Sequence, residues 1–133
     1  MTTILLIEDS RFLRLANERI LSKAGYKVIT AADGEDALDQ LEREDPDLIL
    51  LDMLLPKMGG ELVLQALRRN RKTAGIPVIV ISSLPRSNEA KLRSEGAQAY
   101  LEKSALVEDE GNRLLQVTED TLRHLPMAEG AHV

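Results

Sequence analysis

The sequence predicts an α/β fold in which five strands form a parallel sheet with helices on both faces. Short apolar runs of strand length alternate with helical patterns along the chain, which is typical of repeated strand–helix units. The run at Leu48–Leu51 is continuous rather than alternating, as expected for a strand buried on both faces. Right-handed crossovers between successive strands then place helices on both sides of the sheet.

The first two strand–helix units fill the N-terminal third of the chain. We expect their elements at Ile4–Ile7 (strand), residues 11–24 (helix), Tyr26–Ala31 (strand) and residues 35–44 (helix). Ser10 can cap the first helix, and Gly25 is placed to end it. Lys27 indicates that the second strand lies at an exposed edge of the sheet. Pro46 ends the second helix, because the residue before a proline avoids the α region.

The last three units follow the same pattern. We expect them at Leu48–Leu51 (strand), residues 61–70 (helix), Pro77–Ile81 (strand), residues 88–95 (helix), Ala97–Leu101 (strand) and from residue 104 or 105 to 125 (helix). Gly111 is a weak point within the last helix. One domain therefore covers residues 1–125, and residues 126–133 are expected to form a disordered tail.

Two helices have apolar positions that predict which face is buried. The stripe of the first helix is expected at Leu13, Ala16, Ile20 and Ala24. The helix at residues 61–70 is expected to face the sheet with Leu62 and Ala66, joined by Val63 and Leu67. Its last turn carries Arg68, Arg69 and Arg71, which we interpret as a solvated helix end rather than an anion site.

Composition excludes several classes of protein. The 133 residues are 44% hydrophobic and 29% charged, with a net charge of −5 that argues against nucleic acid as a default partner. The chain has no cysteine, which excludes disulfides and thiolate metal sites and agrees with a cytoplasmic protein. It lacks the basic start of a signal peptide, and no apolar run approaches the ~20 residues of a membrane span.

Polar side chains follow four of the predicted strands. Glu8 and Asp9 follow the first strand and Asp52 follows the third, while Ser82 and Lys103 come at the ends of the fourth and fifth. The carboxyl ends of parallel strands share one edge of the sheet, where such folds bind their ligands. We therefore expect three carboxylates, a hydroxyl and an ammonium group in one pocket, which makes a functional site far more probable than isolated surface acids.

The charges in this pocket predict a metal ion. Two carboxylates ~4 Å apart repel each other by roughly 4 kcal/mol at an effective dielectric constant of 20, and Lys103 offsets only part of this. Oxygen ligands suit Mg²⁺ or Mn²⁺. Asp52 is then either a metal ligand or a nucleophile, and a carboxylate beside Mg²⁺ can attack phosphorus to form an aspartyl phosphate.

These residues resemble the receiver domains of two-component response regulators, particularly the single-domain, chemotaxis-type members. The resemblance covers residues 3–125 and implies a flavodoxin-like, doubly wound (βα)5 fold with strand order 2-1-3-4-5. It rests on Glu8-Asp9-Ser10, Asp33-Gly34-Glu35, Asp52 with Pro56 and Gly59-Gly60, Ser82, Gly96-Ala97 and Tyr100-Leu101-Glu102-Lys103. Each motif alone is weak, whereas the whole set in this order is specific.

The resemblance implies a role for each site residue. Asp52 is the expected phosphoacceptor and Lys103 the phosphate-binding lysine. Mg²⁺, with Mn²⁺ as the alternative, is expected to bind Asp9 directly and Glu8 through water, together with Asp52 and the backbone carbonyl of Leu54. Ser82 is the expected switch hydroxyl. Tyr100 is the expected aromatic switch, with half-buried packing as the alternative.

The implied function is a phosphorelay receiver rather than an enzyme, with at most weak self-phosphorylation and self-dephosphorylation. The phosphodonor would be a histidine kinase or a histidine phosphotransfer protein. A downstream protein would bind the face formed by the fourth helix, fifth strand and fifth helix. One alternative is a phosphorylation-independent pseudo-receiver. Another is a Mg²⁺-dependent aspartate phosphatase, although Leu54 stands where such enzymes carry a second aspartate.

Departures from the family pattern carry further predictions. Ser104 follows Lys103 where most receivers carry a proline, often after a cis bond; a cis bond before serine costs about 2.5–4 kcal/mol, so this loop is trans or strained. Leu54 and Leu84 replace polar residues that steer the hydrolytic water, which predicts slow self-dephosphorylation. Phe12 and Leu15 either contact the kinase or are ordinary apolar residues. His124 and His132 are assigned no role.

Overall fold

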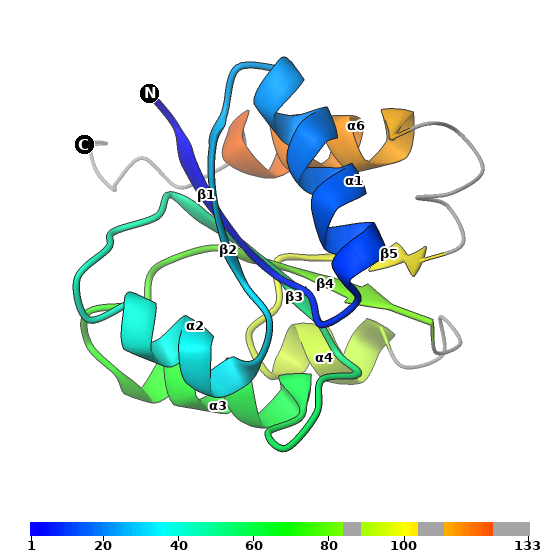
Figure 1. The fold of residues 1–133 in the computed structure, drawn as a ribbon. Coiled ribbons are helices and arrows are strands. Elements are labelled where there is room, and N and C mark those ends of the chain that lie inside the picture. Colours follow the sequence, from blue (N-terminus) through cyan, green and yellow to red (C-terminus); the bar gives the residue numbers. More distant parts are fainter. Residues whose placement is uncertain (84–88, 104–110, 124–133) are drawn as a thin grey trace, which may run out of the picture.

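A five-stranded parallel sheet lies at the centre of the molecule (Figure 1). The computed structural model describes residues 1–83, 89–103 and 111–123. The strands are β1 (Thr3–Ile7), β2 (Lys27–Ala31), β3 (Leu48–Asp52), β4 (Val78–Ser82) and β5 (Ala99–Glu102). Their order is β2-β1-β3-β4-β5, which confirms the predicted fold and places β2 at an edge.

Helices cover both faces of the sheet (Figure 1). One face carries α1 (Arg11–Lys23) and α6 (Asn112–Arg123), and the other carries α2 (Gly34–Gln40), α3 (Gly60–Arg69) and α4 (Glu89–Ser94). Each face has its own apolar cluster, because successive side chains of a strand point to opposite sides. Leu5 and Ile7 of β1 belong to the cluster under α2, α3 and α4, whereas Ile4 and Leu6 belong to the cluster under α1 and α6.

The central strand is buried along its whole length, as its continuous apolar sequence predicts. All five residues of β3 are buried, and those of β4 likewise. Full burial of one Leu, Ile or Val side chain contributes about 1.5–3 kcal/mol before entropy is subtracted. These two buried strands therefore hold their last residues, Asp52 and Ser82, in fixed positions.

Side-chain caps start the first two helices. The Ser10 hydroxyl accepts a hydrogen bond from the N–H of Leu13 at 3.3 Å, as predicted. The Asp33 carboxylate accepts one from Asp36 at 2.7 Å. The helix α2 ends at Gln40, earlier than the predicted residue 44, because the following N–H groups of residues 42 and 43 bond three residues back and tighten the chain before Pro46.

The predicted buried faces of two helices are wrong in part. In α1 the buried residues are Asn17 and Leu21, and Ala24 is exposed. A polar residue, Asn17, thus occupies one of the two buried positions, which apolar periodicity cannot indicate. In α3 Leu62 is 56% exposed. Gly60 lies against the backbone of β3, and this contact turns the buried face of α3 to Val63, Leu64 and Leu67.

The predicted last helix also differs. The helix α6 begins at Asn112, and Gly111 precedes it with φ of +88°, a backbone conformation that cannot continue an α-helix. A Cβ at Gly111 would lie 2.6 Å from Cδ1 of Ile20, so glycine lets the start of α6 approach α1. Residues 104–110 and the predicted tail at 126–133 lie outside the described residues, so those predictions stay open.

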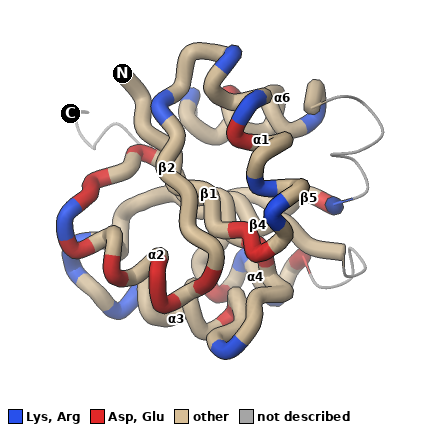
Figure 2. The backbone as a smooth tube through the Cα atoms, in the orientation of Figure 1, with Lys and Arg blue, Asp and Glu red and all other residues tan. Residues whose placement is uncertain are grey.

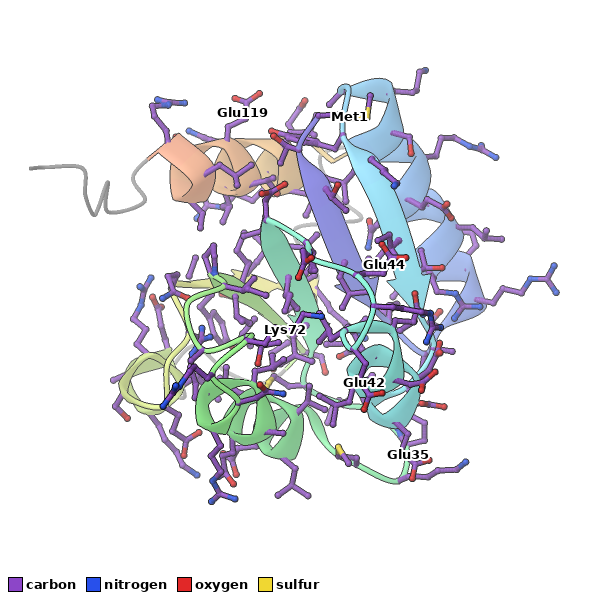
Figure 3. The ribbon with its side chains drawn as sticks, turned by 90° about the vertical axis from the view of Figure 1, so that its left-hand side faces the viewer. Met1, Glu35, Glu42, Glu44, Lys72 and Glu119 are labelled. Atoms are coloured by element: carbon purple, nitrogen blue, oxygen red, sulfur yellow. The ribbon has the colours of Figure 1, made fainter. Side chains whose placement is uncertain are left out.

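Two long cationic side chains connect loops at the N-terminal edge of the sheet. The Lys72 ammonium donates to the carbonyl of Glu42 at 3.0 Å and lies 3.7 Å from an Asp45 oxygen; Lys72 and Glu42 are labelled on the same side of the molecule in Figure 3. Arg68 is half-buried and donates to several backbone carbonyls. The interpretation of Arg68 as part of a solvated helix end is therefore wrong.

Charge is distributed unevenly over the surface. In Figure 2 acidic positions gather along α2 and the chain that follows it, while basic positions lie along α1. Within the described part of the chain, no helix combines the length and the apolar character that crossing a bilayer requires.

Candidate functional site

The predicted site residues meet at the carboxyl edge of the sheet, toward which the arrowheads of β4 and β5 point in Figure 1. Strand pairing aligns Asp52 with Ile81 and Ser82 with Glu102. The Lys103 ammonium lies 2.9 Å from Oδ2 of Asp52 and 3.4 Å from Oε2 of Glu8. The structure thus brings together side chains from the ends of β1, β3 and β5, as the sequence predicts.

Asp52 is buried and carries two strong hydrogen bonds. Its Oδ2 accepts from Lys103 at 2.9 Å, and its Oδ1 accepts from the backbone N–H of Leu54 at 3.0 Å. The whole residue has no exposed surface. Burying a carboxyl group is costly unless it is hydrogen-bonded, and these two donors supply such bonds and fix the orientation of Asp52.

Glu8 is the carboxyl group with the least complete set of partners. Its Oε2 accepts from the N–H of Ser10 at 3.1 Å and from Lys103, whereas Oε1 is buried without a partner among the described residues. Burial, together with the hydrogen bond to Asp52 and the charge of Asp52, raises the pKa of Glu8 to about 7. Near neutral pH this group is therefore protonated more readily than an ordinary glutamate.

The ammonium of Lys103 is the compensating charge. Burial opposes that charge, but the hydrogen bond to Asp52 and the charges of Asp52 and Glu8 outweigh burial and raise the pKa of Lys103. One cation faces three carboxylates, so the pocket keeps an excess of negative charge. Arg14 donates to the main-chain carbonyl of Glu8 at 2.9 Å rather than to a carboxylate, and so braces the backbone.

Glu8, Asp9 and Asp52 fit a divalent cation. One carboxylate oxygen from each lies within 4.8 Å of those of the other two. Glu8 and Asp52 are buried, while Asp9 is exposed and leaves the pocket open to solvent. Hard cations such as Mg²⁺ prefer oxygen ligands of this kind and retain several waters. The unpartnered Oε1 of Glu8 is the observation that favours a cation over further hydrogen bonds.

The loop after Asp52 has a constrained backbone. The N–H of Met58 bonds the carbonyl of Pro56, two residues back, and Lys57 between them has φ of +65°, which is uncommon for a residue other than glycine. The side chain of Leu54 is 52% exposed beside the pocket. A Cβ at Gly60 would lie 2.7 Å from the carbonyl oxygen of Asp52, so glycine is required there.

Ser82 and Tyr100, the predicted switch residues, are both buried. Ser82 is fully buried at the end of β4. Tyr100, paired with Val80 in the sheet, is 4% exposed and packs in the cluster under α3 and α4. The alternative of a half-buried ring is therefore wrong for this structure. Leu84 and Ser104 lie outside the described residues.

Several contacts of the site cannot be predicted from the sequence. The N–H of Leu54 and the guanidinium of Arg14 contact site residues, but a backbone donor has no sequence signature and an arginine on a helix looks solvated. The pair Gly59-Gly60 was the visible signal for the close approach of α3. Phe12 and Leu15 are 77% and 49% exposed on α1, so both are surface residues and not core packing.

Comparison with known proteins assigns the family. The response regulator receiver domain family matches residues 4–115, and the chain belongs to this family. Protein PilG of Pseudomonas aeruginosa is 35% identical over 101 residues, which are 75% of this chain and 75% of that protein. The transcriptional regulatory protein PhoP of Bacillus subtilis is 37% identical over 75% of this chain and 41% of that protein.

Solved structures agree with this assignment. The chemotaxis response regulator CheY4 of Vibrio cholerae superposes with a TM-score of 0.82 at 26% identity, over 91% of this chain and 98% of that one. The response regulator TrrA of Thermotoga maritima, solved in complex with Mg²⁺-BeF, gives 0.78 at 25% identity over 91% and 99%. Against several transcriptional regulators, in contrast, the chain spans about a third of the relative's length, 32% for the ycf27 protein of Porphyridium aerugineum.

Proposed function

We propose that this receiver accepts a phosphoryl group on Asp52 from a phosphohistidine donor and thereby changes a protein-binding face. The observation that carries the proposal is the buried Asp52 carboxylate, bonded by Lys103 at 2.9 Å and by the N–H of Leu54 at 3.0 Å within a cluster of three acids. The Mg²⁺-BeF complex of the Thermotoga relative supports the same chemistry.

In the proposed reaction an Asp52 oxygen forms a bond to phosphorus while the phosphorus–nitrogen bond of the donor breaks. The electron pair of that bond stays on the imidazole nitrogen, which takes up a proton, and Asp52 becomes an acyl phosphate. Lys103 hydrogen-bonds Asp52 before the transfer and donates to a phosphoryl oxygen after it. The N–H of Leu54 is a second donor at the same carboxylate.

A divalent cation, Mg²⁺ or Mn²⁺, would be held by Asp9, Asp52 and the backbone carbonyl of Leu54, with Glu8 acting through water. When bound it supplies positive charge that neutralises the phosphoryl oxygens. Glu8 contributes by keeping an unpartnered oxygen directed into a buried, acidic pocket.

The signal would leave the site through Ser82 and Tyr100. In this proposal the Ser82 hydroxyl donates to the phosphoryl group, and the buried ring of Tyr100 follows it. The affected surface is the face of α4, β5 and α6, where a downstream protein would bind. Receiver domains interact with histidine kinases and downstream effectors, and here the exposed Phe12 and Leu15 would contact the kinase or phosphotransfer protein. We propose a cytoplasmic location and no nucleic-acid contact for this domain.

Receiver domains are generally switches rather than enzymes, and the site agrees with that. The complete set of acids and the lysine speaks against a phosphorylation-independent pseudo-receiver. Leu54 offers no acid two residues after Asp52, which speaks against an aspartate phosphatase. Any self-phosphorylation or self-dephosphorylation is proposed to be weak.

The test is the intact mass of the protein after incubation with a small-molecule phosphodonor, with and without Mg²⁺. We expect an added phosphoryl group that requires Mg²⁺ and is lost in Asp52→Asn. Asp39→Asn is the matched control, because Asp39 is an exposed aspartate of α2 that pairs with Arg43 away from the site. A folded wild-type protein that gains no mass under any condition would contradict the proposal.

A further inference from the structure

The guanidinium group of Arg68 lies where three separate parts of the chain meet. It is half-buried at the last turn of α3, and burial lowers its pKa without discharging it. All of its acceptors among the described residues are carbonyl oxygens. They belong to Gly96 (2.7 Å), Ile76 (2.9 Å), Ala74 (3.1 Å), the Gln98 side chain (3.2 Å) and Thr73 (3.4 Å).

The turn between α4 and β5 is shaped to receive this group. Both Nε and Nη2 of Arg68 donate to the carbonyl of Gly96, at 3.3 and 2.7 Å. Gly96 has φ of +114°, and a Cβ there would lie 2.6 Å from Nε of Arg68. The Gln98 oxygen that Arg68 contacts also accepts from the N–H of Val78 at 2.8 Å, so the same bonds fix the first residue of β4.

The helix α3 connects this turn to the phosphoacceptor. Its first residue, Gly60, donates to the carbonyl of Met53 at 3.2 Å and lies against the backbone of Asp52. Arg68 stands near its other end, and α3 and α4 lie side by side in Figures 1 and 3. The short helix α4 has one buried residue, Leu92, so apolar packing alone holds it weakly. Its C-terminal end is also held by the bonds of Arg68 to Gly96 and Gln98 and by the bond from Arg93 to the carbonyl of Gln98.

We propose that Arg68 is a positioning residue that fixes the C-terminal end of α4 to α3, so that any change in the α4–β5 face on phosphorylation pivots about Gly96. The coupling part rests on the proposed function, while the anchoring part concerns the unmodified protein alone. Other receivers need not use the same device, because the argument rests on the five acceptors of this side chain.

Hydrogen exchange at single amides tests both parts. The informative amides are those of Ala97 and Gln98, which bond the carbonyls of Leu92 and Val78. In the unmodified protein we expect Arg68→Met to speed exchange at these two amides by about tenfold or more. With Mg²⁺ and beryllofluoride, wild type should change only toward the start of α4, whereas Arg68→Met should change at Ala97 and Gln98 as well.

Arg69→Met is the matched control, because Arg69 is exposed on the same turn. Its side chain makes no hydrogen bond or ion pair with the described residues. Arg68→Lys, which keeps the charge but offers fewer directed donors, serves if the methionine variant does not fold. Exchange at Ala97 and Gln98 that is equal in all variants would overturn the anchor. A beryllofluoride response at these amides in wild type would overturn the pivot. Failure of beryllofluoride to bind any variant would refute the proposed function and the pivot, while the unmodified proteins still decide the anchor.

Discussion

Two residues beside Asp52 define how long a phosphoryl group would survive in this site. Lys103 and the N–H of Leu54 are both donors at the carboxylate, and donors stabilise a charged group without activating water. The exposed leucine side chain at position 54 offers neither a donor nor an acceptor to a water molecule. If Asp52 is phosphorylated as proposed, we therefore expect the pocket to stabilise the added charge and to position hydrolytic water poorly.

Leu54→Asn should accordingly shorten the lifetime of the aspartyl phosphate. We expect hydrolysis to accelerate several-fold, because the new amide can hydrogen-bond a water molecule and orient it toward phosphorus. The measurement is the decay of the phosphorylated mass with time. Leu62→Asn is the control, since Leu62 is a comparably exposed leucine on the neighbouring helix. Equal decay in wild type and Leu54→Asn would show that this side chain does not limit hydrolysis.

At the scale of elements, the loop after Asp52 fixes the orientation of helix α3. Its first residue touches the backbone of β3 at Met53 and Asp52, and this contact orients the helix so that Leu62 faces solvent. Hydrophobic periodicity alone could not show this, because apolar residues at 62, 63, 64 and 67 fit more than one helix rotation. The deciding information is a backbone contact, which leaves only the glycine pair as its trace in the sequence.

Gly60→Ala should therefore destabilise the protein. Its Cβ would approach Cα of Met53 to 2.6 Å and the carbonyl of Asp52 to 2.7 Å, and neither backbone atom can rotate away. We expect a loss of about 1–3 kcal/mol in the free energy of unfolding, measured by urea denaturation. Gly59→Ala is the matched control, because nothing lies within 4 Å of a Cβ at that position. A Gly60→Ala variant as stable as Gly59→Ala would mean that the loop adjusts freely.

The arrangement of the strands is the part of the structure that the sequence predicts well. Strand order and the meeting of Glu8, Asp52 and Lys103 follow from alternating elements and from acids placed at strand ends, and the structure confirms both. The sequence mispredicts the role of Arg68, because its acceptors are carbonyl oxygens 5 to 30 residues away in the chain. The position of a carbonyl oxygen depends on the completed fold, and no residue type in the sequence indicates it.

At the scale of the whole molecule, the site links stability to pH and to cations. The folded protein raises the pKa of Glu8 from 4.5 to about 7. A raised carboxyl pKa contributes stability that is fully present below the unfolded value and is lost as the pH rises through the folded value. In the cation-free protein, Glu8 therefore favours the folded state near pH 4.5 and progressively less toward pH 8.

Glu8→Gln should remove this dependence. We expect the unfolding temperature of the cation-free wild type, relative to Glu8→Gln, to fall between pH 5 and pH 8. The apparent affinity for Mg²⁺ should rise about tenfold from pH 6 to pH 8 in wild type, because a group with a pKa near 7 goes from mostly protonated to mostly ionised. Calorimetric titration measures the affinity and thermal unfolding the stability. Parallel pH profiles in wild type and variant would show that Glu8 does not titrate in this range.

Lys103 pairs with Glu8, which lies 95 positions earlier in the chain, and with Asp52, which lies 51 positions earlier. A ribosome-bound chain that has completed β1 to β4 already contains Glu8, Asp9 and Asp52, yet it lacks the ammonium group that pairs with Glu8 and Asp52. The pocket is therefore complete only after the last strand has been made and docked. If Asp52 accepts a phosphoryl group as proposed, we expect a truncated or half-translated copy to be a poor phosphoacceptor, so that only finished molecules would carry the signal.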